Sequence, residues 1–298
     1  MTVHRHLSVT AMAILVVLCA SWGLQQVAIK VALPGVSPLA QAGIRSVGAT
    51  LLICLWMMAR GISLWDRDGT LWVGIAAGLL FSAEFLLIYW GLEFTNASRA
   101  VIFLYLSPFV VALGVHLWVP GERLVAVQVL GLVAAFVGIV LAFGESLTIP
   151  DRKVLMGDSM LVGAAVLWGA TTVLIKASSL ATIAPSKTLL YQLGVSALVL
   201  PLGSFALGEK GIRNLTPLIV GSLAYQTVWV AFATYLMWFW LVRHYPASRL
   251  ASFTFLAPLF GVIAGGVLLQ EPLTPVLLVA LALVGTGIYL VNRRRPAG

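Results

Sequence analysis

The sequence predicts an all-α integral membrane protein whose ten transmembrane helices form two inverted five-helix repeats. Three observations support this prediction: the composition, a series of long apolar segments, and short patterns that occur twice at a nearly constant spacing. The 298-residue chain is 61% hydrophobic and 9% charged, whereas about a quarter of the residues in a soluble domain are charged. This excess of apolar side chains indicates that the solvent of the folded chain is the lipid bilayer.

The apolar segments are long enough to cross a bilayer, for which a helix needs about 20 residues. Polar or Pro/Gly-rich breaks separate them. The first segment exceeds the apolar core of a typical signal peptide, so we expect it to be a membrane helix that is not cleaved. Cys19 and Cys54 lie inside apolar segments, which favours packing over a disulfide bond. The expected helices span residues 7–30, 38–60, 70–92, 97–119, 124–144, 156–179, 187–207, 215–241, 247–269 and 274–292.

Several patterns in the first half of the chain recur in the second half in the same order. Trp22-Gly23 followed by Lys30 recurs as Trp168-Gly169 followed by Lys176, at an offset of 146 residues. The longest polar break, at 144–158, separates the two halves, and we expect one repeat over 1–145 and a second over 146–298. At offsets of 149 or 150, the further echoes pair Ala97-Ser98-Arg99 and Pro108 with Ala247-Ser248-Arg249 and Pro258, Glu122 with Glu271, and Gly138-Ile139 with Gly287-Ile288.

The number of helices and the placement of cations predict the orientation. Each repeat holds five helices, an odd number, so the second repeat enters the membrane from the opposite side, an arrangement that supports alternating access. Eleven Lys and Arg residues fall on the side of the termini and seven on the other side, which places both termini in the cytoplasm. Because the cations lie at helix ends, the net charge of +8 indicates membrane orientation and not nucleic-acid binding.

The paired Trp-Gly…Lys and Ala-Ser-Arg…Pro…Glu patterns resemble those of the drug/metabolite transporter superfamily, and more narrowly its EamA-type ten-helix exporters. The resemblance covers nearly the whole chain, which is most similar overall to the bacterial aromatic amino-acid exporters. It implies a central cavity lined by helices 1, 3, 4, 6, 8 and 9, with helices 5 and 10 at the periphery. It also implies export of amino acids or related metabolites across the bacterial inner membrane. Glu84, in the third helix, is not part of that pattern.

On the helices that the resemblance assigns to the cavity, aromatic and hydrogen-bonding side chains are candidates for substrate binding. Tyr225 and Trp229 are spaced i,i+4 and share one helix face. We expect this face and Trp168 to line one wall, with Trp22 and Gln26 opposite. The alternative for each aromatic residue is packing between helices. An aromatic wall without fixed charge would select substrates by size and apolarity. The candidate residues are Trp22, Gln26, Ser82, Tyr105, Trp168, Thr172, Tyr225 and Trp229.

Two prolines interrupt equivalent helices. Pro108 and Pro258 lie inside the fourth and ninth apolar segments at an offset of 150 residues. Proline removes a backbone hydrogen bond and clashes with the preceding turn, and such breaks in membrane helices often mark binding sites or hinges. We expect matched hinges, with static kinks as the alternative.

Ionisable residues inside the apolar segments are functional candidates. Arg45 and Glu84 lie at similar depths in the second and third expected helices. At 1.5 Å per residue, they are roughly 10 and 12 Å from the outer ends of these helices. Both a structural Arg45–Glu84 pair and a role in coupling transport to an ion stay open. The second half has a neutral counterpart to Arg45 in Gln192, at an offset of 147. Lys30 and Lys176 are expected to extend toward the lipid headgroups.

The leading interpretation is a secondary transporter of small amphipathic metabolites that acts in the lipid bilayer as a monomer, without metal or other cofactor and without nucleic acid. The chain lacks a Walker-type phosphate loop. An integral-membrane enzyme for lipid-like substrates would need clustered carboxylates or a nucleophile–base pair, and only Asp66 and Asp68 are close in sequence. A channel would show a carbonyl filter motif or charged rings, and no such pattern is visible.

Overall fold

The computed structural model describes residues 7–64, 68–95, 97–147, 149–269 and 275–293. Within these ranges the regular structure is helical, apart from an isolated bridge between Val36 and Ile212. The first half contains α1 (Val9–Ala32), α2 (Pro38–Ala59), α3 (Leu71–Gly91), α4 (Ala97–Leu104), α5 (Ser107–Trp118), α6 (Ala126–Phe143) and the short 3₁₀ turn η1 (Gly144–Ser146).

The second half begins with the longest helix and contains a π-helix, η3. Its elements are α7 (Arg152–Ala177), the 3₁₀ turn η2 (Ser179–Ala181), α8 (Pro185–Ala206), α9 (Pro217–Ala224), η3 (Tyr225–Thr234), α10 (Tyr235–His244), α11 (Ala247–Phe253), α12 (Leu256–Leu269) and α13 (Val276–Asn292).

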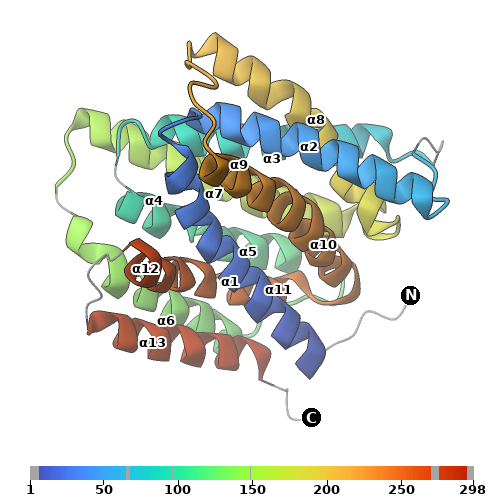
Figure 1. The fold of residues 1–298 in the computed structure, drawn as a ribbon. Helices are drawn as coiled ribbons and strands as arrows, with labels where there is room; N and C mark the ends of the chain where they lie inside the picture. The colour runs from blue at the N-terminus through green and yellow to red at the C-terminus, as the bar shows by residue number, and fades with distance from the viewer. Residues whose placement is uncertain (1–6, 65–67, 96, 148, 270–274, 294–298) are drawn as a thin grey trace.

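Figure 1 shows how these elements cross the molecule, and several consecutive elements share one crossing. Among the described residues, nine helical segments have the length and apolar composition of membrane spans, and α13 adds an apolar helix of 17 residues. The pairs α4–α5 and α11–α12, and the run α9–η3–α10, each form one crossing. Large apolar side chains face outward, such as Leu51 (61% exposed) and Leu278 (72% exposed), as expected for contact with lipid. The predicted all-α, ten-helix membrane fold is therefore confirmed.

Local signals in the sequence set several helix starts. The Ser8 hydroxyl accepts a hydrogen bond from the Ala11 N–H (3.1 Å) before α1, and the Asp151 carboxylate accepts from two N–H groups at the start of α7. Such caps satisfy backbone donors that have no partner within the helix. Proline occupies the first turn of α2, α8 and α9, where its missing N–H costs no helical bond.

The side on which α1 begins and α13 ends is called the terminal face here, and the other side the opposite face (Figure 1). At the terminal face, Lys187 of α8 forms an ion pair of 2.6 Å with Asp68, in the loop before α3. Hydrogen bonds from Lys187 and from the Thr70 hydroxyl lower the pKa of Asp68 to about 2. At the opposite face, the Glu209 carboxylate accepts hydrogen bonds from the Ser37 hydroxyl and the Leu39 N–H. These contacts fasten α2 and α3 to α8.

Both proline-containing crossings are interrupted. α4 ends at Leu104 and α5 begins at Ser107, while α11 ends at Phe253 and α12 begins at Leu256. In each case the break lies just before the proline predicted to cause it, because a proline lacks the N–H that would continue the hydrogen-bond ladder.

The first helix of each half packs on the broken crossing of the other half. A Cβ atom placed on Gly23 of α1 would lie 2.7 Å from the Ala257 carbonyl oxygen and 2.7 Å from Phe260 Cβ in α12. A Cβ atom on Gly169 of α7 would lie 3.3 Å from the Ser107 carbonyl oxygen and 2.5 Å from Val110 Cβ in α5. Ser107 and Val110 stand 150 residues before Ala257 and Phe260, so the two echoed glycines make the same kind of contact.

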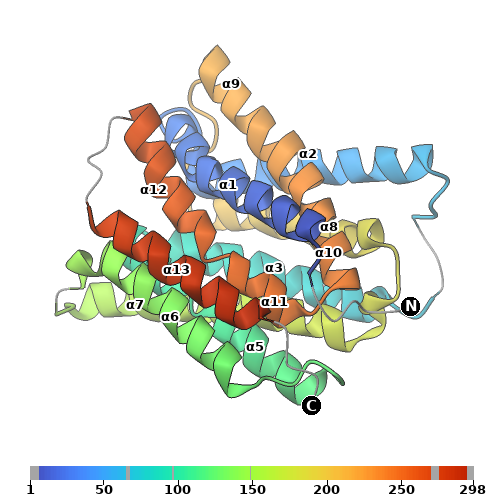
Figure 2. The same ribbon diagram turned by 90° about the horizontal axis from the view of Figure 1, so that it is seen from below.

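α6 and α13, the fifth and tenth crossings, lie side by side along one edge of the molecule (Figures 1 and 2). Their echoed glycines form the interface: a Cβ atom on Gly138 would lie 2.9 Å from the Ala280 carbonyl oxygen, and one on Gly287 would lie 2.4 Å from the Gly131 carbonyl oxygen. Small residues permit such close approach of membrane helices. The position of both helices at an edge agrees with the expectation from the family resemblance.

Replacing Gly23 with Ala should lower the thermal stability of the detergent-solubilised protein. The new Cβ atom would lie 2.6 Å from the Gly261 nitrogen, and this backbone atom moves only if α12 moves, at a cost of about 1–3 kcal/mol. Gly285→Ala in α13 is the matched control because no atom lies within 4 Å of its added Cβ, and alanine favours a helix by about 1 kcal/mol. Equal unfolding temperatures for the two variants would contradict the proposed close contact.

Candidate functional site

The two helix breaks meet in the interior of the protein. Tyr105 lies in the break between α4 and α5, Phe255 lies in the break between α11 and α12, and their ring centroids are 6.0 Å apart. The two positions differ by 150 residues. Trp168 of α7 packs edge-on against Tyr105 at 6.0 Å, and Phe109 packs against Phe255 at 6.5 Å. Aromatic rings from both halves therefore fill the centre, where the two crossings are interrupted.

Trp22, the echo of Trp168, has different surroundings. Its indole N–H donates to the Thr234 hydroxyl (3.0 Å) at the end of η3. The ring packs edge-on against Trp238 at 5.5 Å and Tyr235 at 6.4 Å, both in α10. Both echoed tryptophans thus contact aromatic residues inside the protein, but on different helices.

Tyr225 and Trp229 reach the same residue of α1. The Tyr225 hydroxyl donates to the Ser21 carbonyl oxygen (3.0 Å), and the Trp229 indole N–H donates to the Ser21 hydroxyl (2.9 Å). The expected shared face is therefore present. The expected single wall with Trp168 is not, because η3 directs this face toward α1 while Trp168 packs on Tyr105.

The polar candidates differ in how free they are to bind a ligand. Ser82 and Thr172 are buried, and each donates its hydroxyl to a carbonyl oxygen one turn back in its own helix. Gln26 is exposed. Its side chain lies beside Gly261 of α12, since a Cβ atom added to Gly261 would be 3.8 Å from Gln26 Cγ. Of these three, Gln26 alone carries a side chain that is both exposed and free of a bond to its own helix among the described contacts.

The predicted Arg45–Glu84 ion pair is not formed. Arg45 is 1% exposed and Glu84 is 6% exposed, and their charges are close enough to interact. However, Nε and both terminal nitrogens of Arg45 have no hydrogen-bond partner. The guanidinium carbon lies 4.6 Å from the centroid of the Phe85 ring and 6.0 Å from that of Tyr235. Stacking on Phe85, the residue after Glu84, thus replaces the predicted pair.

The cation–π contacts of Arg45 do not fully offset the free-energy cost of burying its charge. Cation–π contacts contribute up to about 2 kcal/mol each when desolvated, while an arginine at the centre of a membrane helix costs at least about 2.5–3.5 kcal/mol. The rings can offset part of this cost, but they leave the N–H donors of the guanidinium unsatisfied.

An ionic contact that the sequence did not predict joins the end of α7 to the α5–α6 connection, α10 and α11 at the terminal face. Lys176 Nζ, at the end of α7, lies 3.4 Å from Glu122 Oε1 and donates to the carbonyl oxygens of Val242 (2.7 Å) and Tyr245 (2.8 Å). Glu122, between α5 and α6, accepts from the Ala247 N–H (2.7 Å) at the start of α11. Burial raises the pKa of Glu122, and the charge of Lys176 opposes that effect.

The expectation that Lys176 extends to the headgroups is therefore wrong: the residue is 9% exposed and bound inside the protein. The sequence nevertheless marked both partners of this contact as repeated positions, since Lys176 echoes Lys30 and Glu122 echoes Glu271. Glu271 lies outside the described residues. At the opposite face, Arg99 at the start of α4 forms an ion pair with Asp158 of α7, and Thr95 donates to the same carboxylate (2.9 Å).

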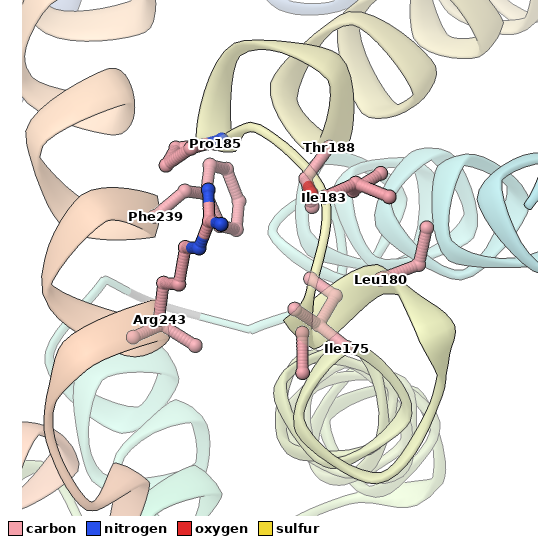
Figure 3. Close-up of a pocket in the computed structure, with 9 residues that line it drawn as sticks. Ile175, Leu180, Ile183, Pro185, Thr188, Phe239 and Arg243 are labelled. Atoms are coloured by element: carbon pink, nitrogen blue, oxygen red, sulfur yellow. The ribbon is translucent and has the colours of Figure 1, made fainter. Parts of the chain in front are cut away.

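Two hollows lie away from the central rings. A cleft of about 210 Å³ opens near the opposite face among the ends of α1, α2 and α3 and the residues after α8, with Tyr89, Leu39 and Glu209 in its lining. A hollow of about 10 Å³ lies at the terminal face between α7, α8 and α10, where Arg243 reaches toward Phe239 and Pro185 (Figure 3). Since the second has space for at most a single water molecule, it is no substrate site.

The described residues contain no group of three or more His, Cys, Asp or Glu side chains placed to hold a metal ion. The candidate site consists of aromatic rings, a buried guanidinium and an ion pair at the terminal face.

Proteins similar to this chain over most of its length include two that are named transporters or efflux pumps. An uncharacterized transporter of Bacillus subtilis, YvbV, is 28% identical over 280 residues, which cover 93% of this chain and 89% of the relative. A probable amino-acid metabolite efflux pump of Salmonella typhimurium is 26% identical over 289 residues, covering 94% of this chain and 93% of the relative. A solved crystal structure that is 18% identical shares the fold, with a TM-score of 0.79 over 95% of this chain and 98% of that one.

The sequence pattern of the EamA-like transporter family matches this chain twice, over residues 9–144 and 155–293. The two matches lie on either side of the polar break and together cover most of the chain. With nine apolar helices of membrane length and one shorter apolar helix in the part of the chain that the structure describes, this multi-pass membrane protein belongs to the EamA-like transporter family, within the superfamily that its paired motifs resemble.

Proposed function

We propose that the protein is a secondary active transporter that exports aromatic and other apolar or neutral amino acids, or related small metabolites, across the inner membrane. In this proposal the units 1–145 and 146–298 are inverted repeats, both termini are cytoplasmic, and transport proceeds by alternating access.

The observation that carries the proposal is the matched packing of α1 on α12 and of α7 on α5. Each contact uses an echoed glycine and an interrupted crossing from the other half. Two halves that hold each other by equivalent contacts can exchange their arrangements, and this exchange moves the opening of a central site from one face to the other. The contact between Tyr105 and Phe255, equivalent positions 150 residues apart, supports such an exchange around the two breaks.

The Lys176–Glu122 contact supports a closed terminal face. It links the end of α7, the α5–α6 connection and the start of α11, and α5 and α11 border the breaks that hold Tyr105 and Phe255. An ion pair of this kind stabilises one conformation over the other by the energy of the contacts made only there.

The aromatic interior supports an apolar or aromatic substrate. Two groups of aromatic rings lie in the interior and offer ring faces and edges. One consists of Trp168, Tyr105 and Phe255, and the other of Trp22, Tyr235 and Trp238. Such surfaces accept side chains of varied shape. A relative with more than nine-tenths coverage is named a probable amino-acid metabolite efflux pump, which agrees with amino acids as the cargo.

Purified protein in liposomes should show saturable counterflow of aromatic and large apolar amino acids, which is the test of the proposed function. Trp168→Ala should reduce the preference for aromatic over aliphatic substrates by about 3–10-fold, since aromatic contacts contribute about 0.5–1.5 kcal/mol beyond burial. Trp72→Ala is the control because Trp72 is 78% exposed on the outside of α3. Flux that never saturates would indicate a channel, and product formation in detergent would indicate an enzyme.

Replacing Pro108 or Pro258 with Ala should slow transport by about tenfold while changing substrate affinity little. Alanine restores the backbone N–H, so α4–α5 or α11–α12 can become continuous and lose its hinge. Pro201→Ala is the matched control, because Pro201 lies within α8 without ending that helix. Normal flux in both single variants and in the double variant would show that the prolines are static kinks.

Lys176→Met should open the terminal face. Cys19 is fully buried near Phe253, and a membrane-permeant maleimide should modify it faster in this variant on a Cys54→Ser background. Loss of a contact made in one conformation shifts the equilibrium by about 1–3 kcal/mol, or 5–150-fold. Lys153→Met removes an exposed lysine from the same helix and should leave the rate unchanged. Equal modification rates in both variants would remove the support for a gate.

A further inference from the structure

The guanidinium of Arg45 is a strong donor group without an acceptor. Arg45 is the largest side chain that is fully buried, and its three nitrogens have no hydrogen-bond partner. Arginine stays protonated in proteins, so it cannot lose its charge to avoid this situation. Charged groups in membrane helices usually find a partner, which indicates that the partner of Arg45 is a molecule other than this chain.

The neighbouring polar side chains do not supply the missing acceptor. One turn before Arg45 on α2, Gln41 donates to the Val36 carbonyl oxygen (3.0 Å) and accepts from Gln226 (3.2 Å). The Glu84 carboxylate is near but forms no hydrogen bond with the guanidinium. The polar neighbours of Arg45 are thus either engaged elsewhere or held apart from it.

The fold itself does not require a cation at this position. The echoed position in the second half is Gln192, which is neutral and equally buried in α8. A helix at the same place in the architecture therefore packs without a charge, and the charge in the first half has another cause.

The surroundings of Arg45 fit an amino acid with a large apolar side chain. Phe85 and Tyr235 flank the guanidinium, and their rings belong to a continuous series in which Phe81 contacts Phe85 (4.9 Å) and Tyr235 (6.2 Å), and Tyr235 contacts Trp22 (6.4 Å). A fork of parallel N–H donors binds a carboxylate in a bidentate manner. The nearby Glu84 offers an acceptor for an ammonium group.

This position is also close to an opening. Tyr89 lines the cleft of about 210 Å³ near the opposite face, and its ring centroid lies 6.2 Å from that of Phe85. Leu39, on the same helix as Arg45, lines the cleft as well. The ring on which the guanidinium stacks thus contacts a ring that lines this cleft.

We propose that Arg45 binds the carboxylate of the transported molecule and that Glu84 binds its ammonium group, so that the cargo is a zwitterionic α-amino acid. This inference rests on the proposed transport function and goes further by assigning the two charged ends of the substrate. In this proposal the two charges bind different ends of the same ligand, the guanidinium its carboxylate and the Glu84 carboxylate its ammonium group.

Counterflow inhibition with four related compounds tests the assignment. L-Phenylalanine has both charged groups, phenylalaninamide and phenethylamine lack the carboxylate, and 3-phenylpropanoate lacks the amine. In the unmodified protein, phenylalanine should inhibit at least tenfold better than any of the others. Arg45→Gln should abolish the advantage given by the carboxylate, Arg45→Lys should retain part of it, and Glu84→Gln should abolish only the advantage given by the amine.

Arg60→Gln is the matched control. Arg60 ends the same helix and also stacks on an aromatic ring, Trp56, at 5.8 Å, but it is exposed at the terminal face. This variant should keep the inhibition profile of the unmodified protein. An unchanged preference for the carboxylate in Arg45→Gln, together with a lower unfolding temperature, would show that Arg45 is a structural residue and would overturn the proposal.

A binding measurement separates this proposal from the transport function. Phenylalanine and 3-phenylpropanoate should raise the unfolding temperature of the detergent-solubilised protein more than phenethylamine does, and Arg45→Gln should remove that difference. If no amino acid is transported but this pattern is found, the transport function fails and the carboxylate site stands. If amino acids are transported and the amide inhibits as well as the acid, the carboxylate site fails and the transport function stands.

Discussion

The close approach of α1 to α12 and of α7 to α5 is the constraint on which the rest of the structure depends. At Gly23 and Gly169 the neighbouring backbone or Cβ atoms leave no space for a side chain. In a bilayer the hydrophobic effect does not hold helices together, so van der Waals contact between small residues takes its place. Because each contact joins one half to the interrupted crossing of the other, both breaks are brought to the centre. There Tyr105 and Phe255 meet, with their ring centroids 6.0 Å apart.

The sequence could predict the elements of this arrangement but not how the helices turn about their own axes. Composition and segment length are enough to locate ten crossings, and proline chemistry locates the breaks before Pro108 and Pro258. Depth along the membrane was also predictable for Arg45 and Glu84, since it follows from counting residues. Which neighbour each side chain faces depends on helix rotation, so the Arg45–Phe85 contact was missed. The spacing of Tyr225 and Trp229 likewise predicted a shared face but not that the face meets Ser21.

The π-helix η3 explains part of the difference between the predicted and the observed neighbours of these side chains. π-helical turns are rare and occur often at functional sites, and here ten residues adopt this form in the middle of a crossing. Their wider turn changes the direction in which the following residues point, so that α10 presents Tyr235 and Trp238 to Trp22. The corresponding crossing of the first half, α3, is a regular α-helix. Sequence periodicity at 3.6 residues per turn cannot anticipate a local departure from that period.

Residues that recur in both halves and residues present in only one half have different structural roles, and this difference follows from the symmetry of the two halves. Glycines, prolines and Lys and Glu residues near helix ends recur in both halves, and among the described residues they form packing contacts, helix breaks and the Lys176–Glu122 ion pair. A substrate has no such symmetry, since its charged groups and its side chain differ. In the proposed transporter, recognition of the two charged groups therefore comes from residues present in one half only. Arg45 and Glu84 meet that requirement: both are charged, buried and near the aromatic series, and the echoed position of Arg45 carries the neutral Gln192.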